Sequence, residues 1–227
     1  MSQARDAADL PTWKILVGMA MQTVLFSSGG ALLWTLADRS VAQFVSLSLR
    51  EVGLGLALAA ALIMTSAALA WRFPAFAEWL VRSQADQYPF LKNRLSIAAI
   101  ALVSIGAGVG EEALFRGGFQ TLFAAYLPLP LALALASGLF AAVHFARPIN
   151  SVLIFVIGCL FGAVYWATGS LLAVMIGHAV YDVYALWALQ EALHRLGVFD
   201  EKADQALRDK PADETLAATT RTTGENP

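Results

Sequence analysis

The sequence predicts an all-α membrane protein, a polytopic bundle of about six transmembrane helices. Of its 227 residues, 58% are hydrophobic and 14% are charged, whereas about a quarter of the residues in a soluble domain are charged. The mean hydropathy is positive, at +0.63. Several uncharged runs are long enough to cross about 30 Å of hydrocarbon at about 1.5 Å per helical residue. An ordinary soluble domain is therefore excluded.

The N-terminal part, residues 1–93, is expected to hold two transmembrane helices and an interfacial segment. The first span is predicted at 14–37, because its uncharged run is too long for a signal peptide and no clean cleavage site follows it. The second is predicted at 52–70. Charged and aromatic residues mix between Trp71 and Arg94, which is typical of an amphipathic segment on a membrane surface. Its basic residues predict that this segment and both termini are cytoplasmic.

Residues 94–192 are expected to form a helical core with the remaining spans. The apolar segment from Leu95 to about Tyr126 is too long for one perpendicular crossing. We expect it to bend or break at three closely spaced glycines, beside a cavity. These glycines are Gly106, Gly108 and Gly110. The last three spans are predicted at 131–146, 149–168 and 170–190. The polar segment 193–227 is expected to be a disordered tail.

Two acids and a base lie within the uncharged region that surrounds them: Glu111, Glu112 and Arg116. Each ionised side chain near a bilayer centre costs about 2.5–3.5 kcal/mol. Glu112 and Arg116 are four residues apart, so they share a helix face and can form an ion pair. Glu111 points elsewhere and needs a partner on another helix, a metal or a water. A purely structural ion cluster between helices is the alternative for this motif.

Three further ionisable residues lie in the predicted spans: His144, His178 and Asp182. A single histidine in a membrane helix commonly serves as an interhelical hydrogen-bond donor. Together, however, two histidines and the glutamates are the side chains that bind a divalent metal or polarise a water. The two imidazoles of His144 and His178 and one of the two glutamates would supply the three protein ligands of a catalytic zinc site, and the second carboxylate could act as general base. Three helices would have to converge.

The three motifs, in this order and on separate spans, resemble the CAAX protease and bacteriocin-processing family of intramembrane endopeptidases. The motifs are Glu-Glu-x-x-x-Arg at 111–116, Phe-x-x-x-His at 140–144 and His-x-x-x-Asp at 178–182. The match covers roughly residues 95–190. The resemblance implies an all-helical membrane enzyme that cleaves peptide bonds in or near the bilayer, with its catalytic core in residues 94–192.

The resemblance also implies roles for individual residues. Glu111 and His144 would activate the attacking water, and His178 with the residue four later would stabilise the oxyanion. Arg116 would orient the glutamates. Many family members have asparagine at the position of Asp182, and an ionised aspartate cannot donate a hydrogen bond to an oxyanion. Asp182 is therefore either protonated or, as we expect, an acceptor that orients His178.

Cofactor, partners and location follow from the same resemblance. A divalent metal, Zn²⁺, is expected at Glu111, His144 and His178, while a metal-independent glutamate mechanism stays open. The expected partners are the lipid bilayer and a protein or peptide substrate, including one that carries a lipid; no nucleic acid is expected. The expected location is the plasma membrane of a bacterium. The alternative function is a transporter or proton relay that uses the buried Glu, His and Asp groups.

Overall fold

The computed structural model describes residues 10–144 and 146–200, and within these ranges it contains helices and no strand. Residues 1–9 and the part of the predicted tail from 201 to 227 lie outside the described residues. The helices in chain order are α2 (Thr12–Leu36), η1 (Val41–Gln43), α3 (Leu49–Arg72), α4 (Pro74–Gln84), η2 (Pro89–Lys92), α5 (Ile97–Glu112), η3 (Ala113–Gln120), α6 (Thr121–Tyr126), α7 (Leu129–Ala142), α8 (Pro148–Thr168) and α9 (Leu171–Arg195).

Within the described residues, five helical segments are long and apolar enough to cross a membrane. They are α2, α3, the continuous segment Ile97–Tyr126, α8 and α9. The predicted span at 131–146 is the shorter helix α7, whose 14 residues extend about 21 Å at about 1.5 Å each, less than the hydrocarbon thickness. The predicted fold class, a polytopic helical bundle, is confirmed, with one helix shorter than expected.

Serine caps start three of the long helices. The side chains of Ser48, Ser96 and Ser170 each accept a hydrogen bond from a backbone N–H in the first turn of α3, α5 and α9. Such a cap satisfies a donor that has no partner inside the helix. The end of α8 is set by Gly169, whose φ of 65° lies in the left-handed region that glycine adopts without strain.

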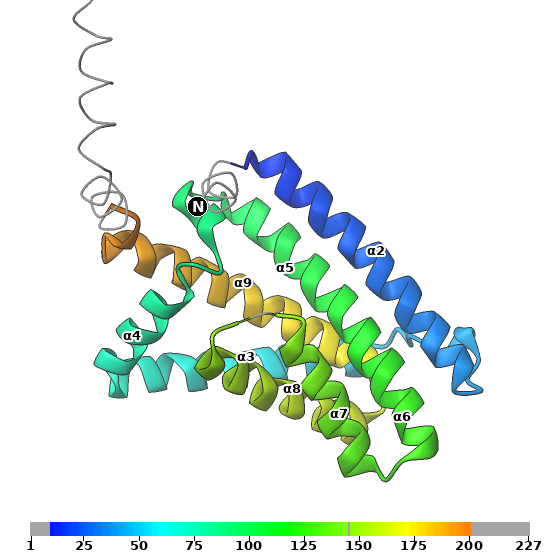
Figure 1. Cartoon of the computed structure of the whole chain (residues 1–227). Helices are drawn as coiled ribbons and strands as arrows, with labels where there is room; N and C mark the ends of the chain where they lie inside the picture. The colour runs from blue at the N-terminus through cyan, green and yellow to red at the C-terminus, as the bar shows by residue number, and fades with distance from the viewer. Residues whose placement is uncertain (1–9, 145, 201–227) are drawn as a thin grey trace, which may run out of the picture.

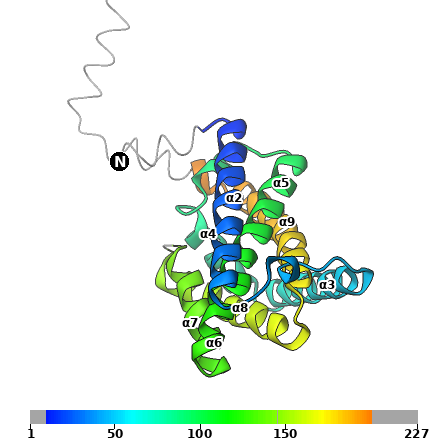
Figure 2. The ribbon, with the colours of Figure 1, turned by 90° about the vertical axis from the view of Figure 1, so that its right-hand side faces the viewer.

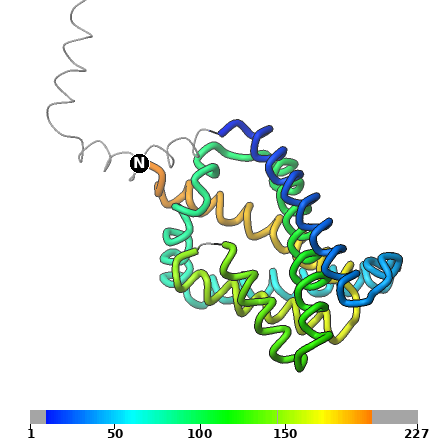
Figure 3. The backbone as a smooth tube through the Cα atoms, turned by 45° about the vertical axis from the view of Figure 1, so that its right-hand side comes forward, coloured from blue at the N-terminus to red at the C-terminus, as the bar shows by residue number. Residues whose placement is uncertain are grey.

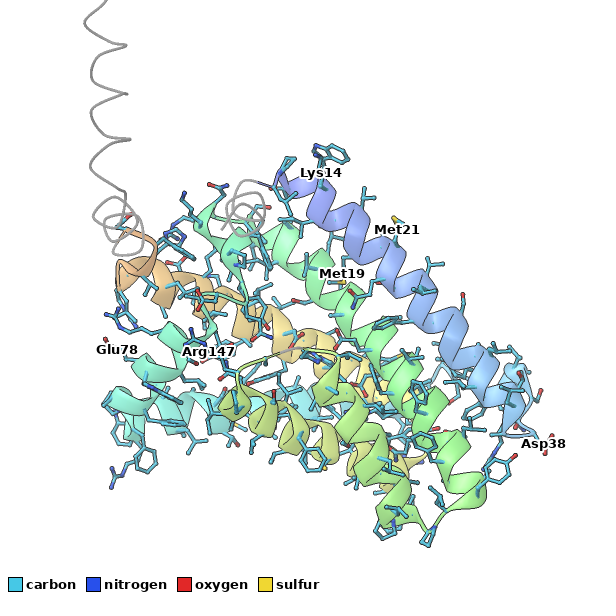
Figure 4. The ribbon with its side chains drawn as sticks, viewed as in Figure 1. Lys14, Met19, Met21, Asp38, Glu78 and Arg147 are labelled. Carbon is cyan, nitrogen blue, oxygen red and sulfur yellow. The ribbon has the colours of Figure 1, made fainter. Side chains whose placement is uncertain are left out.

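Helices α2 and α5 lie side by side and run in the same direction (Figures 1 and 2). Small residues permit a close contact just beyond the end of α5, where a Cβ on Gly30 would lie 2.1 Å from the carbonyl oxygen of Ala113, the first residue of η3. In Figure 4 Met19 lies between the two helices, whereas Met21, which is 68% exposed, points away from α5. The outward face of α2 is therefore apolar and available to lipid.

The predicted bend at the three glycines of the third span is wrong. Helix α5 continues without interruption from Ile97 to Glu112. The glycines instead permit close helix packing. A Cβ on Gly106 would lie 2.6 Å from Met19 Cγ of α2, and one on Gly108 would lie 2.6 Å from the backbone of Ala179 of α9. The irregular geometry follows them, in η3, which is a π-helix of eight residues. Such segments are frequent at functional sites.

Helix α9 is the central element, since it contacts both α3 and α5 extensively. It extends to Arg195, five residues beyond the predicted end at 190, and its last turns are fixed to the start of α5. The amide of Gln190 accepts from the Leu95 N–H at 2.8 Å and donates to the Leu95 carbonyl at 3.2 Å. This crossing of α9 against α5 can be followed along the backbone in Figure 3.

Helices α7 and α8 form an antiparallel pair, and α4 lies next to the loop that connects them. Ser83 of α4 donates to Asn150 at 3.2 Å, and Asp86 forms an ion pair with Arg147. Figure 4 shows Arg147 and Glu78 on the same side of the molecule, away from Asp38 at the far end of α2. The predicted interfacial segment is thus a short helix attached to the α7–α8 loop.

Candidate active site

Glu112 at the end of α5, Arg116 of η3 and His178 of α9 form a buried network. Glu112 Oε1 accepts from Arg116 Nη1 at 2.8 Å and from His178 Nδ1 at 2.7 Å. The three residues are 0%, 1% and 6% exposed. The predicted Glu112–Arg116 ion pair is therefore confirmed, and it also holds the His178 ring. Removing one partner of such a pair leaves an uncompensated buried charge, which typically costs about 3–5 kcal/mol.

The π-helix also fixes α8 by two side-chain hydrogen bonds that repeat at a spacing of four residues. Arg116 Nη2 donates to the Gly158 carbonyl and Gln120 Nε2 donates to the Gly162 carbonyl, both at 2.9 Å. A Cβ on Gly162 would lie 2.7 Å from Gln120 Oε1. Gly158 and Gly162, which are four residues apart as in a GxxxG pattern, therefore let polar side chains of η3 reach backbone oxygens of α8.

Aromatic rings complete the surroundings of these charges. The Arg116 guanidinium lies 4.6 Å from the centroid of Phe140 and 5.6 Å from that of Phe161. Phe161 stacks on the His178 ring at 5.0 Å, with an angle of 17° between the planes. A guanidinium attracted by ring faces needs fewer hydrogen-bond partners. Phe140 belongs to one of the sequence motifs, whereas Phe161 had no motif to indicate it.

Glu111 is the carboxylate that faces the cavity. Its Oε2 lies 4.0 Å from His144 Nε2 and 3.9 Å from His178 Nε2, and its Oε1 lies 3.5 Å from Gln22 Nε2 of α2. The structure therefore brings together the acid and the two histidines that the sequence placed on three separate segments. Gln22 was missed, although it is the single amide side chain of α2 and was a visible signal.

His144 lies two residues after the end of α7, not on the helix as predicted. Its Nδ1 is 2.7 Å from the Phe140 carbonyl oxygen, and because a carbonyl can only accept, Nδ1 carries the proton. A neutral ring then presents an unprotonated Nε2 toward Glu111. The Gln87 side chain donates to the His144 backbone carbonyl at 3.3 Å. The ring is thus held by its own helix end and by the segment that follows α4.

Asp182 lies one helical turn after His178, with Oδ2 3.3 Å from His178 Nε2. It is in the middle of α9, and its side chain is 33% exposed. All six residues chosen from the sequence are therefore found in one contiguous group. They are Glu111, Glu112, Arg116, His144, His178 and Asp182.

The positions of these side chains bear on the expected metal. In residues 10–144 and 146–200, no group of three or more His, Cys, Asp or Glu side chains is placed to hold a metal ion. The donor types suit zinc, and the two imidazoles have the hydrogen-bonded second nitrogen that zinc ligands commonly have. However, His178 Nε2 lies nearer to Asp182 (3.3 Å) than to Glu111 (3.9 Å). The arrangement therefore does not fit a bound metal as it stands.

The group borders a cavity of about 1070 Å³ between α4, α5, α8 and α9. Polar and apolar side chains mix along its walls, among them Glu111, His144, Asp182, Leu153 and Tyr88. Tyr88 comes from the segment between α4 and η2. Burial, followed by the negative charges of Asp182 and Glu111, raises the pKa of Tyr88 to about 12. The predicted cavity beside Glu111 is confirmed, and Tyr88 is a member of its wall that the sequence did not indicate.

Comparison with known proteins gives one family match. Residues 93–184 match the family model described as type II CAAX prenyl endopeptidase Rce1-like. No curated protein and no solved structure matches the chain. The matched residues include all three motifs and the segments α5 to α8 with most of α9.

Proposed function

Because residues 93–184 match the model of the Rce1-like family of type II CAAX prenyl endopeptidases, we propose that this chain hydrolyses a peptide bond with a water activated by Glu111 and His144. The family supports a CAAX-type intramembrane endopeptidase, and the apolar helices indicate an integral membrane protein. The single observation that carries the residue assignment is the convergence of His144 Nε2 and His178 Nε2 on Glu111 Oε2, at 4.0 and 3.9 Å.

The 4.0 Å separation between His144 Nε2 and Glu111 Oε2 suits one water between them. A water that is hydrogen-bonded at about 2.8 Å to each atom fits a triangle with this base. Both atoms are acceptors, so each can take a proton from the water. The oxygen attacks the carbonyl carbon of the substrate, the proton passes to the leaving nitrogen, and the C–N bond breaks.

His178 then faces the developing oxyanion, with its orientation fixed by two carboxylates. Glu112 holds Nδ1 at 2.7 Å, and Asp182 lies 3.3 Å from Nε2. Arg116 does not face the cavity; it positions Glu112, and through Glu112 the His178 ring. We assign Glu111, His144 and His178 to the reaction, and Glu112, Arg116 and Asp182 to the positioning of the other three.

No step of this mechanism requires a metal. Zn²⁺ at Glu111, His144 and His178 stays a prediction of the sequence, and it would supply a Lewis acid for the water and the carbonyl. Since the three side chains are not placed for an ion, we propose the metal-independent glutamate mechanism. Protein dialysed against a chelator is expected to keep its rate, and elemental analysis is expected to find less than one zinc per chain. Loss of activity that Zn²⁺ restores would reverse this choice.

The proposed substrate is a protein or peptide that reaches the cavity from the membrane or its surface, including one with a lipid on its C-terminal part. The mixed apolar and polar walls of the cavity can take both a hydrophobic group and a polypeptide backbone. We further propose that the protein lies in the plasma membrane of a bacterium, with the basic segment around α4 on the cytoplasmic side.

The decisive experiment measures cleavage of quenched fluorescent peptides by the purified protein in detergent, with and without a C-terminal prenylated cysteine. We expect Glu111→Gln and His144→Ala to lower kcat/KM by about 10²–10⁴-fold, the usual contribution of a general base. Glu191→Gln is the matched control, because Glu191 is exposed and pairs with Arg94 at the surface. Wild-type rates in both site variants would contradict the assignment.

A further inference from the structure

Tyr88 stands apart from the sequence motifs, yet it lies in the wall of the same cavity. Its ring packs edge to face on Phe90, with 5.9 Å between the centroids, and on the core cluster that includes Leu91 and Leu193. These contacts hold the ring between the start of α5 and the last turns of α9. A phenol held in this way cannot move away without disturbing buried neighbours.

Tyr88 lines the same cavity as Glu111 and the two histidines of the site, and its hydroxyl remains a donor. The charges of Asp182 and Glu111 contribute, after burial, to the rise of its pKa to about 12. Both carboxylates therefore act on the phenol, and at neutral pH the hydroxyl keeps its proton. Among the described residues, no hydrogen bond fixes this hydroxyl to a protein partner, which leaves the O–H available to a bound molecule.

The other groups at the site offer at most one such donor, the Nε2 of His178. Ionised Glu111 and Asp182 can only accept hydrogen bonds, and the Nδ1 proton of His144 is already given to the Phe140 carbonyl. His178 gives its Nδ1 proton to Glu112, so only its Nε2 faces the cavity. Hydrolysis of a peptide bond places a negative charge on the carbonyl oxygen, and enzymes commonly stabilise it with more than one donor.

We propose that the Tyr88 phenol is a hydrogen-bond donor of this active site, binding the carbonyl oxygen of the scissile peptide bond and stabilising the oxyanion beside His178. The inference rests on the proposed peptidase function and adds a residue to it. The phenol keeps its proton throughout; the proton that reaches the leaving nitrogen still comes from the attacking water. Tyr88 thus supplies the donor that Asp182, as a carboxylate, does not.

The test compares Tyr88→Phe with Tyr126→Phe in the peptide cleavage assay. Each substitution removes one hydroxyl, and Tyr126 is 75% exposed at the end of α6. We expect Tyr88→Phe to lower kcat by about 10²–10³-fold, the effect of losing one oxyanion donor. KM should change little, because the bond strengthens only in the transition state. Tyr126→Phe should keep the wild-type rate, and both variants should keep the wild-type thermal midpoint.

A second measurement does not depend on how the variant folds. A peptide phosphinate, which imitates the tetrahedral intermediate, is bound to the wild-type protein and the complex is solved. Tyr88 Oη within about 2.5–3.0 Å of a phosphinyl oxygen supports the proposal. A hydroxyl that points away from the inhibitor, or a Tyr88→Phe enzyme with the wild-type kcat, overturns it.

The Glu111→Gln variant tests the proposed peptidase function separately from the role of Tyr88. If Glu111→Gln cleaves as fast as the wild type, the proposed function fails and the role of Tyr88 fails with it. If Glu111→Gln is inactive while Tyr88→Phe is fully active, only the role of Tyr88 is wrong. The two failures therefore have separate signatures in one assay.

Discussion

Glu111 and Glu112 are neighbours in the chain, yet their carboxylates have different surroundings. Glu112 is fully buried, and its Oε1 is shared by Arg116 and His178. Glu111 borders the cavity, and its nearest basic groups are about 4 Å away. The turn of about 100° between successive helical residues separates the two side chains. One glutamate can therefore support the site while the other performs the chemistry.

The role of Asp182 as a hydrogen-bond acceptor of the His178 ring can be tested by two substitutions. Its Oδ2 lies 3.3 Å from His178 Nε2, so we expect Asp182→Asn to keep substantial activity, because the amide oxygen can still accept from the ring. Asp182→Leu keeps the branched side chain with the same number of heavy atoms but has no acceptor, and it should lower kcat by about 10-fold or more, the effect usual for groups that orient a functional histidine. The rates of both variants are measured with the fluorescent peptides.

The positioning role of Asp182 is distinguished from a structural one by thermal unfolding of the same two variants. We expect their thermal midpoints to stay near that of the wild type, because the Asp182 side chain is 33% exposed. Equal loss of activity in Asp182→Asn and Asp182→Leu would contradict the role as an acceptor.

Among the elements, the π-helix η3 and its contact with α2 decide how the site is assembled. The segment carries Arg116, which reaches both Glu112 and the backbone of Gly158 on α8. Its first residue, Ala113, lies against Gly30 of α2. A backbone-to-backbone contact of this kind excludes any side chain, so the position of η3 depends on a glycine some 80 residues earlier in the chain.

Gly30→Ala is therefore expected to destabilise the protein. The new Cβ would lie 2.1 Å from the Ala113 carbonyl oxygen, and forcing extra volume into a packed contact typically costs about 1–3 kcal/mol. The thermal midpoint in detergent should fall, and activity should fall with it because η3 carries Arg116, the partner of Glu112. Gly18→Ala on the same helix is the matched control, since a Cβ there meets nothing within 4 Å. Equal midpoints for the two variants would show that α2 can shift without cost.

The arrangement of the bundle as a whole agrees with a chain that crosses a membrane back and forth. Helices α2 and α5 run in the same direction, and the contact of Leu95 with Gln190 makes α9 antiparallel to α5. Lys14, Arg94 and Arg195 lie at the ends of these three helices that face the same way. Basic residues favour the cytoplasmic side of a membrane.

This arrangement predicts on which side of the membrane single introduced cysteines lie. The cysteines are introduced into a Cys159→Ala variant, because Cys159 is the single native cysteine. A membrane-impermeant maleimide added to intact cells should label Asp38→Cys and leave Lys14→Cys and Lys92→Cys unlabelled. In inside-out vesicles the pattern should reverse. Labelling of Lys14→Cys and Asp38→Cys from the same side would contradict a membrane crossing by α2.

The contribution of sequence patterns is clear from particular residues. The apolar runs predicted the long helices, since a segment in lipid must satisfy its backbone internally. The spacing of Glu112 and Arg116 predicted their ion pair, because residues four apart share a helix face. Charges that are costly to bury indicated Glu111, His144, His178 and Asp182 as a group.

The tertiary structure determined the contacts between separate helices, which the spacing of residues along the chain does not predict. The role of Gly106 and Gly108 in packing, where a bend was predicted, depends on α2 and α9 lying against them. The position of His144 beyond α7 depends on the Phe140 carbonyl and Gln87. Tyr88 has no motif at all. Local periodicity and the cost of burying a charge depend on the residues of one segment, so the sequence alone determines them. The distance between two segments depends on how all the helices pack, so only the tertiary structure determines it.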